Sequence, residues 1–117
     1  MHSSREYLGA HRLFQTQSVD EARQTVAAKF CDHRLELSSG SKGVAMRHNH
    51  VAGCATSLNY MTYGSDVSID PGALQSFYLV QVPLTGHARI LHRRTEVFAD
   101  AGMATVLNPD RETQMHW

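Results

Sequence analysis

The feature that most constrains the fold of this chain is the stretch at residues 76–86, which reads SFYLVQVPLTG. Residues 77–82 are aromatic or β-branched residues and Leu, apart from one amide, Gln81, and this composition is typical of a largely buried strand. Pro83 has no N–H to donate, so it marks the end of the strand, a bulge or an unpaired edge. The glycine that ends the stretch permits a turn into a second apolar strand at residues 87–92. We therefore expect a hairpin with a tight corner, as in the wall of a small β-barrel.

Short segments of alternating apolar and polar residues fill most of the remaining chain. A loop is expected at residues 38–43, and tight turns are expected at Gly53 and at residues 64–66, 70–72, 93–94, 99–102 and 108–111. Strands are expected between them, at residues 44–51, 54–63, 67–69, 96–98, 103–107 and 113–117. Short strands at this spacing predict a mainly antiparallel β-sandwich or barrel.

One helix is expected, at residues 19–30. Ser18 and Glu21 form a capping box, in which the Ser18 hydroxyl accepts from the Glu21 amide while Glu21 reaches back to the cap. Apolar residues then recur at helical spacing, which predicts one stripe packed on the core. The members of this stripe are Val19, Ala22, Val26 and Phe30. A short strand at residues 14–17 is expected to lead into the helix.

Composition bounds the classes of protein that remain. A chain of 117 residues has room for one domain, residues 1–117. Its 11 basic and 11 acidic residues cancel, which argues against a nucleic-acid-binding surface, since such surfaces are strongly basic. No apolar run approaches the roughly 20 residues of a membrane span, and the N-terminus lacks the apolar core of a secretory signal. We expect a cytoplasmic protein in which Cys31 and Cys54 are reduced and behave as small buried hydrophobes.

Two clusters could carry a charged ligand or a metal ion. His48 and His50 point to the same face of a predicted strand, where they form either half of a metal site or a polar surface pair. Arg93 and Arg94 either bind an anion or occupy a solvated turn. Apart from these pairs, the sequence has no nucleophile elbow, phosphate loop or His-Glu-x-x-His motif, so no catalytic constellation is expected.

Three segments, in their order along the chain, carry a family resemblance. They are residues 53–64 (GCATSLNYMTYG), 78–86 (YLVQVPLTG) and 99–109 (ADAGMATVLNP), and they follow the capped helix. A strand ending in Tyr-Gly, a Pro-Leu-Ser/Thr-Gly corner and a Gly-x-Ala-x-Val-Leu-x-Pro turn recur in this order in one family. The chain thus resembles the N-terminal sensing domain of AraC/XylS-type bacterial transcription regulators.

This resemblance implies a cupin-like double-stranded β-barrel, or jelly roll, with one N-terminal helix and a small-molecule effector. In the family, DNA is bound by a separate C-terminal domain of two helix-turn-helix motifs, which this sequence lacks. We therefore expect a fragment of a longer regulator that contacts DNA only through that absent domain. Homodimerisation is also expected, because family members often dimerise through this domain and a truncated barrel exposes a strand edge and apolar surface.

The same resemblance bears on metal binding. At the first cupin metal motif this chain has Ala73, Gln75 and Leu79, and near the second motif it has only His116. We expect no metal, no other cofactor and no catalytic residue, and hence a binding pocket. The alternatives are a small metal-dependent cupin enzyme, such as an isomerase or dioxygenase, and a purely structural dimerisation module.

Polar side chains within otherwise apolar strands are the candidates for the pocket, because a few such groups orient a small ligand. The predicted ligand-binding residues are Asn59, Tyr60, Tyr78, Gln81, His87 and Arg89. Arg89 suits a carboxylate through paired hydrogen bonds, and regulators of this kind often sense small organic or aromatic acids. The alternative is that Arg89 faces solvent and Gln81 pairs with the backbone.

Overall fold

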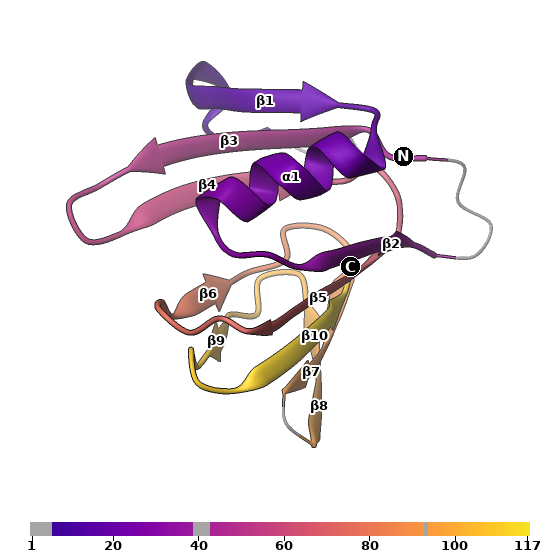
Figure 1. Ribbon diagram of the computed structural model, residues 1–117, viewed down its shortest axis with the longest axis vertical. Coiled ribbons are helices and arrows are strands. Elements are labelled where there is room, and N and C mark those ends of the chain that lie inside the picture. The colour runs from indigo at the N-terminus through magenta and orange to yellow at the C-terminus, as the bar shows by residue number, and fades with distance from the viewer. Residues whose placement is uncertain (1–5, 39–42, 93) are drawn as a thin grey trace.

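A computed structural model describes residues 6–38, 43–92 and 94–117, and the chain in these ranges is mainly β, as predicted (Figure 1). The elements are η1 (Gly9–His11), β1 (Arg12–Thr16), α1 (Val19–Lys29), β2 (Arg34–Leu37), β3 (Met46–Ala52), β4 (Ser57–Thr62), β5 (Val67–Ala73), β6 (Leu79–Gln81), β7 (His87–His92), β8 (Thr95–Asp100), β9 (Thr105–Leu107) and β10 (Glu112–His116).

The strands form three antiparallel sheets. Their orders are β1-β3-β4, β2-β5-β10-β7-β8 and β6-β9. Figure 1 shows the three-stranded sheet at the top with α1 crossing in front of β4, and the five-stranded sheet below, beginning with β2 under the helix. No ladder among the described residues joins the three sheets, so the mainly antiparallel β architecture is confirmed without a closed ring of hydrogen bonds.

Helix α1 forms where its cap and its apolar stripe predicted. The Ser18 hydroxyl oxygen accepts from the backbone N–H of Glu21 at 3.2 Å. The second half of the capping box is different, because the backbone N–H of Ser18 donates to Thr16 Oγ1 at 3.0 Å instead of meeting the Glu21 side chain. Ala22 and Val26 are buried, and the helix contacts β1 and β2.

The core is continuous from the helix to the far strands. Its largest fully buried apolar side chains are Met46, Val67 and Ile90, contributed by β3, β5 and β7. The last residue, Trp117, exchanges two backbone hydrogen bonds with Val67, of 2.9 and 3.1 Å. Elements from both large sheets therefore share one apolar interior, which fixes the positions of the outward-facing side chains.

Glu6 fastens the segment before β1 to the three-stranded sheet. Its carboxylate accepts from Arg12 at 2.7 Å, from Arg47 at 3.0 Å and from the buried Asn49 amide at 3.2 Å. The bond from Arg12 is the main reason that the pKa of Glu6 lies below its ordinary value. The chain ahead of β1 thus has a defined contact with β3.

The predicted hairpin between residues 77–82 and 87–92 is wrong. β6 pairs with β9, with Val80 opposite Val106, whereas β7 pairs with β8 and β10. The tight corner at residues 83–86 is real, but it carries the chain from one sheet to another. The carbonyl of Pro83 accepts from the Gly102 N–H at 2.8 Å, which keeps the end of β6 beside the β9 segment.

The predicted turn at residues 70–72 is also wrong, because β5 continues through Pro71 and Gly72 to Ala73. Its neighbour β10 shifts register here, pairing Thr113 with Gly72 and Met115 with Ile69. A proline is tolerated in a strand at such an irregularity, because its missing N–H then interrupts no ladder bond. The local turn chemistry persists as a bulge within β5, because Gly72 has a φ of 67° and its N–H donates to Asp70 Oδ1 at 3.1 Å.

Several other strand ends differ from the predictions. β4 begins at Ser57, not Cys54, because the Gly53 N–H donates to the Thr56 carbonyl at 2.7 Å and closes a longer hairpin loop. β8 extends into the predicted turn, as far as Asp100, and β9 begins at Thr105. β3 starts two residues later than expected and β1 two residues earlier.

Cys31 is half-buried against the core, whereas Cys54 is exposed in the β3–β4 loop, so the prediction of burial is wrong for Cys54. Both thiols are free. Most of the predicted loop, residues 39–42, and Arg93 lie outside the described residues, while Arg94 is exposed in the turn between β7 and β8.

Candidate functional site

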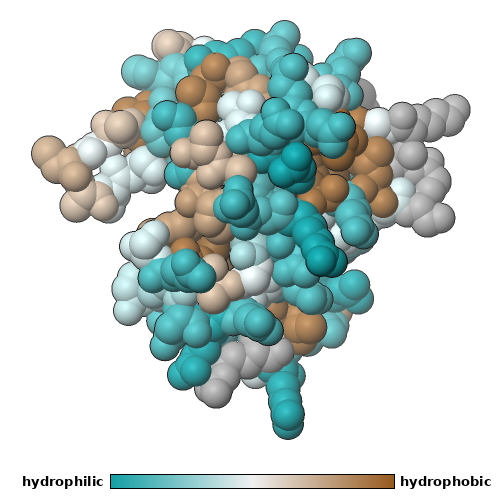
Figure 2. All heavy atoms as spheres, viewed as in Figure 1, coloured by the Kyte–Doolittle hydropathy of each residue, from teal (hydrophilic) through white to brown (hydrophobic). Residues whose placement is uncertain are grey.

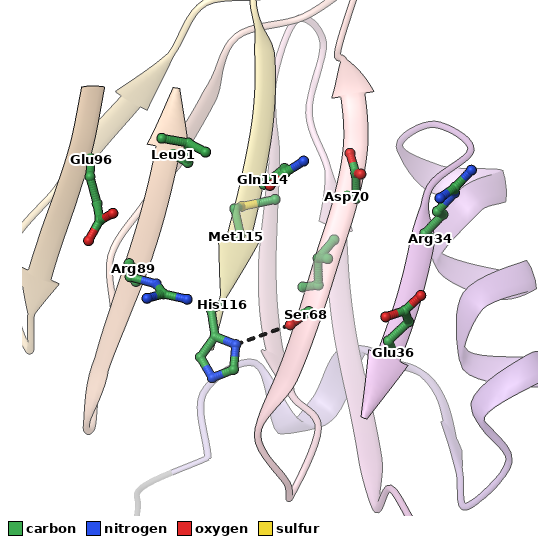
Figure 3. Close-up of a pocket in the computed structure, with 11 residues that line it drawn as sticks. Arg34, Glu36, Ser68, Asp70, Arg89, Leu91, Glu96, Gln114, Met115 and His116 are labelled. Atoms are coloured by element: carbon green, nitrogen blue, oxygen red, sulfur yellow. Dashed lines mark hydrogen bonds between the residues drawn. The ribbon is translucent and has the colours of Figure 1, made fainter. Parts of the chain in front are cut away.

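A groove with a volume of about 410 Å³ crosses the outer face of the five-stranded sheet (Figure 3). All five strands of that sheet contribute to it. This volume lies within the range of about 300–1,000 Å³ typical of small-molecule sites. The residues that line the groove are Arg34, Glu36, Ser68, Ile69, Asp70, Arg89, Leu91, Glu96, Gln114, Met115 and His116.

Strand alternation places Arg89 in this groove. Ala88 and Ile90 of β7 are buried in the core, and Arg89 and Leu91 point to the opposite side. Side chains of successive strand residues face opposite sides of a sheet, so the burial of Ile90 forces Arg89 outward.

Strand register sets Arg89 beside a row of polar groups. Arg89 lies opposite His116 of β10, and His116 lies opposite Ser68 of β5. Ser68 is in turn opposite Glu36 of β2. Directly opposed residues have Cβ atoms only about 4.5–5.5 Å apart, so these four side chains follow one line across the sheet.

A second row runs parallel to the first. Leu91 lies between Glu96 of β8 and Gln114 of β10, and at the far edge Asp70 is opposite Arg34. Leu91 supplies an apolar surface on β7, one strand in from the β8 edge, where it is 38% exposed. Acidic groups thus stand toward both ends of the groove, while its centre carries apolar and donor groups.

The Arg89–His116–Ser68 row is rich in hydrogen-bond donors. Within the described residues Arg89 makes no hydrogen bond or ion pair, and Figure 3 shows its guanidinium directed toward His116. His116 Nδ1 and Ser68 Oγ are joined by a hydrogen bond of 3.1 Å. An exposed guanidinium without a partner, next to an imidazole, is able to bind a carboxylate with two parallel hydrogen bonds.

The six predicted ligand-binding residues do not meet at one place. Arg89 lines the groove, and His87 is exposed on the same outward side of β7 but does not line it. Tyr78 is 65% exposed beside β6. Gln81 is half-buried, and its Nε2 has no partner among the described residues, so that nitrogen does not pair with the backbone.

Asn59, from β4, joins an inner cluster of polar side chains. Its Oδ1 accepts from His48 Nε2 at 2.8 Å and from His50 Nδ1 at 2.7 Å, and its Nδ2 donates to Ser57 Oγ at 3.1 Å. An amide oxygen can only accept, so both of these ring nitrogens carry a proton. The neighbouring Tyr60 has its ring centroid 6.2 Å from that of Tyr7.

His48 is fully buried, so the interpretation of a polar surface pair is wrong for this residue. Phe30 stacks on its ring with centroids 5.9 Å apart, and Phe14 meets it edge-on at the same separation. Burial lowers the pKa of His48 from its ordinary 6.5, against an opposing contribution from the Asn59 bond. Its Nδ1 has no partner in the described chain, so a second proton there would have no acceptor.

The His48–Asn59–His50 cluster brings together two imidazoles and one amide. No group of three or more His, Cys, Asp and Glu side chains that could hold a metal ion occurs in the described ranges. The two ring nitrogens that face each other are already bonded to the Asn59 oxygen. The cluster instead acts as a polar cross-link between β3 and β4.

Sequence reasoning missed most residues of the groove. The sequence offers His116 only as a loose match to a metal motif, and it carries no signal for Ser68, Glu36 and Arg34. Alternation along residues 112–116 could have placed His116 on the outer face. Its position beside Arg89 depends on the pairing of two strands that are distant in sequence, for which no local signal exists.

A family model described as an AraC-binding-like domain matches residues 22–117, which include every strand from β2 to β10. No curated protein and no solved structure matches the chain. Separately, no helix among the described residues is long and apolar enough to cross a membrane. The fold of the matched family is cupin-like, in agreement with the predicted fold class. The chain belongs to the AraC-binding-like domain family.

Proposed function

We propose that this chain is the ligand-sensing and dimerisation domain of an AraC-type transcription regulator, and that its effector is a small organic acid. The observation that carries the proposal is the family match over residues 22–117. A domain with this role acts in the cytoplasm and controls DNA binding by a separate domain, and it performs no chemistry on its effector.

The outer groove is the proposed effector site. Arg89 supplies a guanidinium without an ion-pair partner in the described chain, and His116 and Ser68 extend the donor row. Leu91 offers an apolar contact of the kind that an aromatic or aliphatic body requires. A carboxylate bound at Arg89 would thus have its apolar part beside Leu91.

The acidic side chains restrict the choice of effector. Glu36, Asp70 and Glu96 all line the groove, and none of them lies between Arg89 and Ser68 in the cross-strand row. Like charges repel, so these carboxylates disfavour a ligand with several negative charges. The proposed effector is therefore a small monocarboxylate, and a second polar group on it would be neutral or cationic.

The alternative of a metal-dependent cupin enzyme has a direct test. Metal analysis of the purified protein is expected to find no stoichiometric iron, manganese or zinc. A stoichiometric metal, together with its loss in a His48→Gln and His50→Gln double variant, would favour the enzyme and contradict the proposal.

The effector site is tested by thermal denaturation with a panel of small carboxylates, beginning with benzoate and its hydroxylated relatives. At least one is expected to raise the melting temperature, because a ligand that binds only the folded state stabilises it. Arg89→Ala is expected to remove this shift. The matched control is Arg94→Ala, which removes an exposed arginine from the β7–β8 turn, outside the groove.

The outcomes separate two parts of the proposal. If a carboxylate raises the melting temperature equally in the wild type and in Arg89→Ala, Arg89 is not the anchor. If no carboxylate shifts the wild type while neutral or cationic compounds do, the effector class is wrong and sensing itself stands.

A further inference from the structure

The outer face of the two-stranded sheet is apolar and exposed. Val80 and Val106 are direct cross-strand partners, and each is 62% exposed. Tyr78 and Val82 share the side of Val80 by alternation, since Leu79 packs against the core from the other side. We call Tyr78, Val80, Val82 and Val106 the β6–β9 face.

Two more exposed apolar side chains occur in the segments that adjoin this face along the chain. Leu84 is 52% exposed and Met103 is 47% exposed. The hydrogen bond between the Gly102 N–H and the Pro83 carbonyl holds their segments together. The largest apolar patch on the exterior of a monomer is often functional, and protein–protein interfaces are one of its common roles.

The β6–β9 face also lacks charge. No Asp, Glu, Lys, Arg or His occurs in residues 71–86 or in residues 101–109. By contrast, both edges of the five-stranded sheet carry charges, with Glu96 and Asp100 on β8 and Arg34 and Glu36 on β2. Charged residues on sheet edges oppose association. The edges of the five-stranded sheet are therefore protected against association, whereas the two-stranded sheet has no such charges.

We infer that the β6–β9 face is the contact surface between two copies of this chain, packed face to face about a two-fold axis. The inference rests on the proposed dimerisation and names its surface. In such an interface the same patch meets itself, so each residue near the axis lies close to its own copy. Covering the face desolvates no charged side chain, which removes the main cost of burying a surface.

The lack of charge on the β6–β9 face also indicates which kind of partner can cover it. Nucleic acid and charged peptides require counter-charges, and the β6–β9 face offers none. A second copy provides an equal apolar area, and the formal net charge of +0 at pH 7 keeps long-range repulsion between copies small. Sheets with apolar faces pack on one another at a separation of about 10 Å, with interdigitated side chains.

The area of the patch determines how much surface each partner can bury in the dimer. Its six side chains expose on the order of 500 Å² per partner, judged from the sizes of such side chains. A standard stable interface buries about 800 Å² per partner. This area is smaller than that of a standard stable interface, so the dimer is expected to be weak, with its population depending on protein concentration.

Sedimentation velocity of the 117-residue chain over a concentration series tests the interface. The wild type is expected to pass from monomer to dimer. Val80→Glu is expected to weaken association by about a hundredfold, because a charge then lies near its own copy across the axis. Leu58→Glu is the matched control, since Leu58 is 64% exposed on β4, and it should associate like the wild type.

A charge-swap experiment isolates self-association through this face. Val80→Glu and Val80→Lys should each be monomeric, and an equimolar mixture of the two should recover dimers at low salt. Far-ultraviolet circular dichroism checks that both variants keep the fold.

Two results would overturn the inference. A wild-type dimer that survives both Val80 variants would place the interface elsewhere while dimerisation stands. A wild-type monomer at millimolar concentration would remove both the interface and the proposed dimerisation. Neither result changes the effector-induced shift in melting temperature, so the sensing proposal is judged separately.

Discussion

The inner cluster around His48 and the outer groove around His116 use similar side chains in opposite ways. Each histidine lies on an antiparallel strand and makes a hydrogen bond to a neighbouring strand. His48 is fully buried between Phe14 and Phe30. His116 lies on the open face of its sheet, beside the guanidinium of Arg89, which has no ion-pair partner among the described residues.

This difference distinguishes polar side chains that stabilise the fold from polar side chains that are available to bind a ligand. The inner cluster fixes two strands because its three side chains are bonded to one another behind aromatic rings. The outer row has donors left over, and these donors face a groove. Unused hydrogen-bonding capacity at an accessible position, more than polarity itself, marks the proposed binding site.

The largest effect is expected when a charge enters the interior beside the inner cluster. Val26 is 6% exposed on the buried side of α1, and Phe30 of the same apolar stripe stacks on His48. Val26→Asp should lower the free energy of unfolding by roughly 3–5 kcal/mol, because its carboxylate would be buried without a partner. Urea titration followed by circular dichroism measures this loss.

The control for this substitution is Leu58→Asp, which places the same charge at a 64% exposed position of β4. It should change the free energy of unfolding by less than about 0.5 kcal/mol. Similar losses in the two variants would contradict the assignment of α1 to the shared core.

A smaller loss is expected from Asn59→Leu. The substitution removes the oxygen that accepts from both His48 and His50, and the His48 N–H then lies buried without an acceptor. Such an unsatisfied group costs about 1–3 kcal/mol. Ser57→Ala removes only the outer partner of the Asn59 amide, so it should leave stability nearly unchanged in the same titration.

The contrast between the two regions also shows what the sequence could reveal. The helix and its stripe were predictable because Ser18, Ala22 and Val26 act within a few residues of one another. The outward direction of Arg89 follows from the alternation of β7, once one knows that Ile90 is inside. Local patterns therefore predicted elements and the faces of single strands.

Long-range pairing was not predictable in the same way. The corner after Pro83 looks the same in sequence whether the chain turns back in a hairpin or crosses to another sheet. Pro71 is typical of a turn, and only the pairing of β5 with β10, which places a bulge in β5 here, shows that it lies within a strand. The burial of His48 likewise depends on the Phe30 ring, which stacks on it, and on Phe14 of the neighbouring strand β1, and the spacing of two histidines encodes neither contact.

The inner cluster is also expected to make stability depend on pH. Burial holds the pKa of folded His48 below the 6.5 of an ordinary histidine. As the pH falls through the unfolded value, the unfolded chain therefore binds a proton that the folded chain does not, and the folded state loses stability. Stability is therefore complete above about pH 7 and is lost progressively as the pH falls below the unfolded-state pKa of about 6.5 toward the lower folded-state pKa.

Urea titrations at a series of pH values measure this dependence. His48→Phe keeps an aromatic ring and removes the titrating group, so its stability should fall less between pH 7 and pH 5. His116→Gln removes an imidazole from the outer groove without touching His48, and it should retain the wild-type slope. An identical slope in wild type and His48→Phe would show that His48 does not cause the dependence.

The smallest effect on stability is expected in the outer groove. Arg89 is exposed and, among the described residues, makes no hydrogen bond or ion pair. Arg89→Ala should therefore change the free energy of unfolding by no more than about 0.5 kcal/mol, while it abolishes the carboxylate-induced rise in melting temperature. Urea titration and ligand titration of the same preparation measure the two quantities together.

A loss above about 1 kcal/mol would give Arg89 a structural role like that of the inner cluster, and the contrast between the two regions would fail. An unchanged stability with a lost ligand response is the result that a binding residue, free of structural partners, produces.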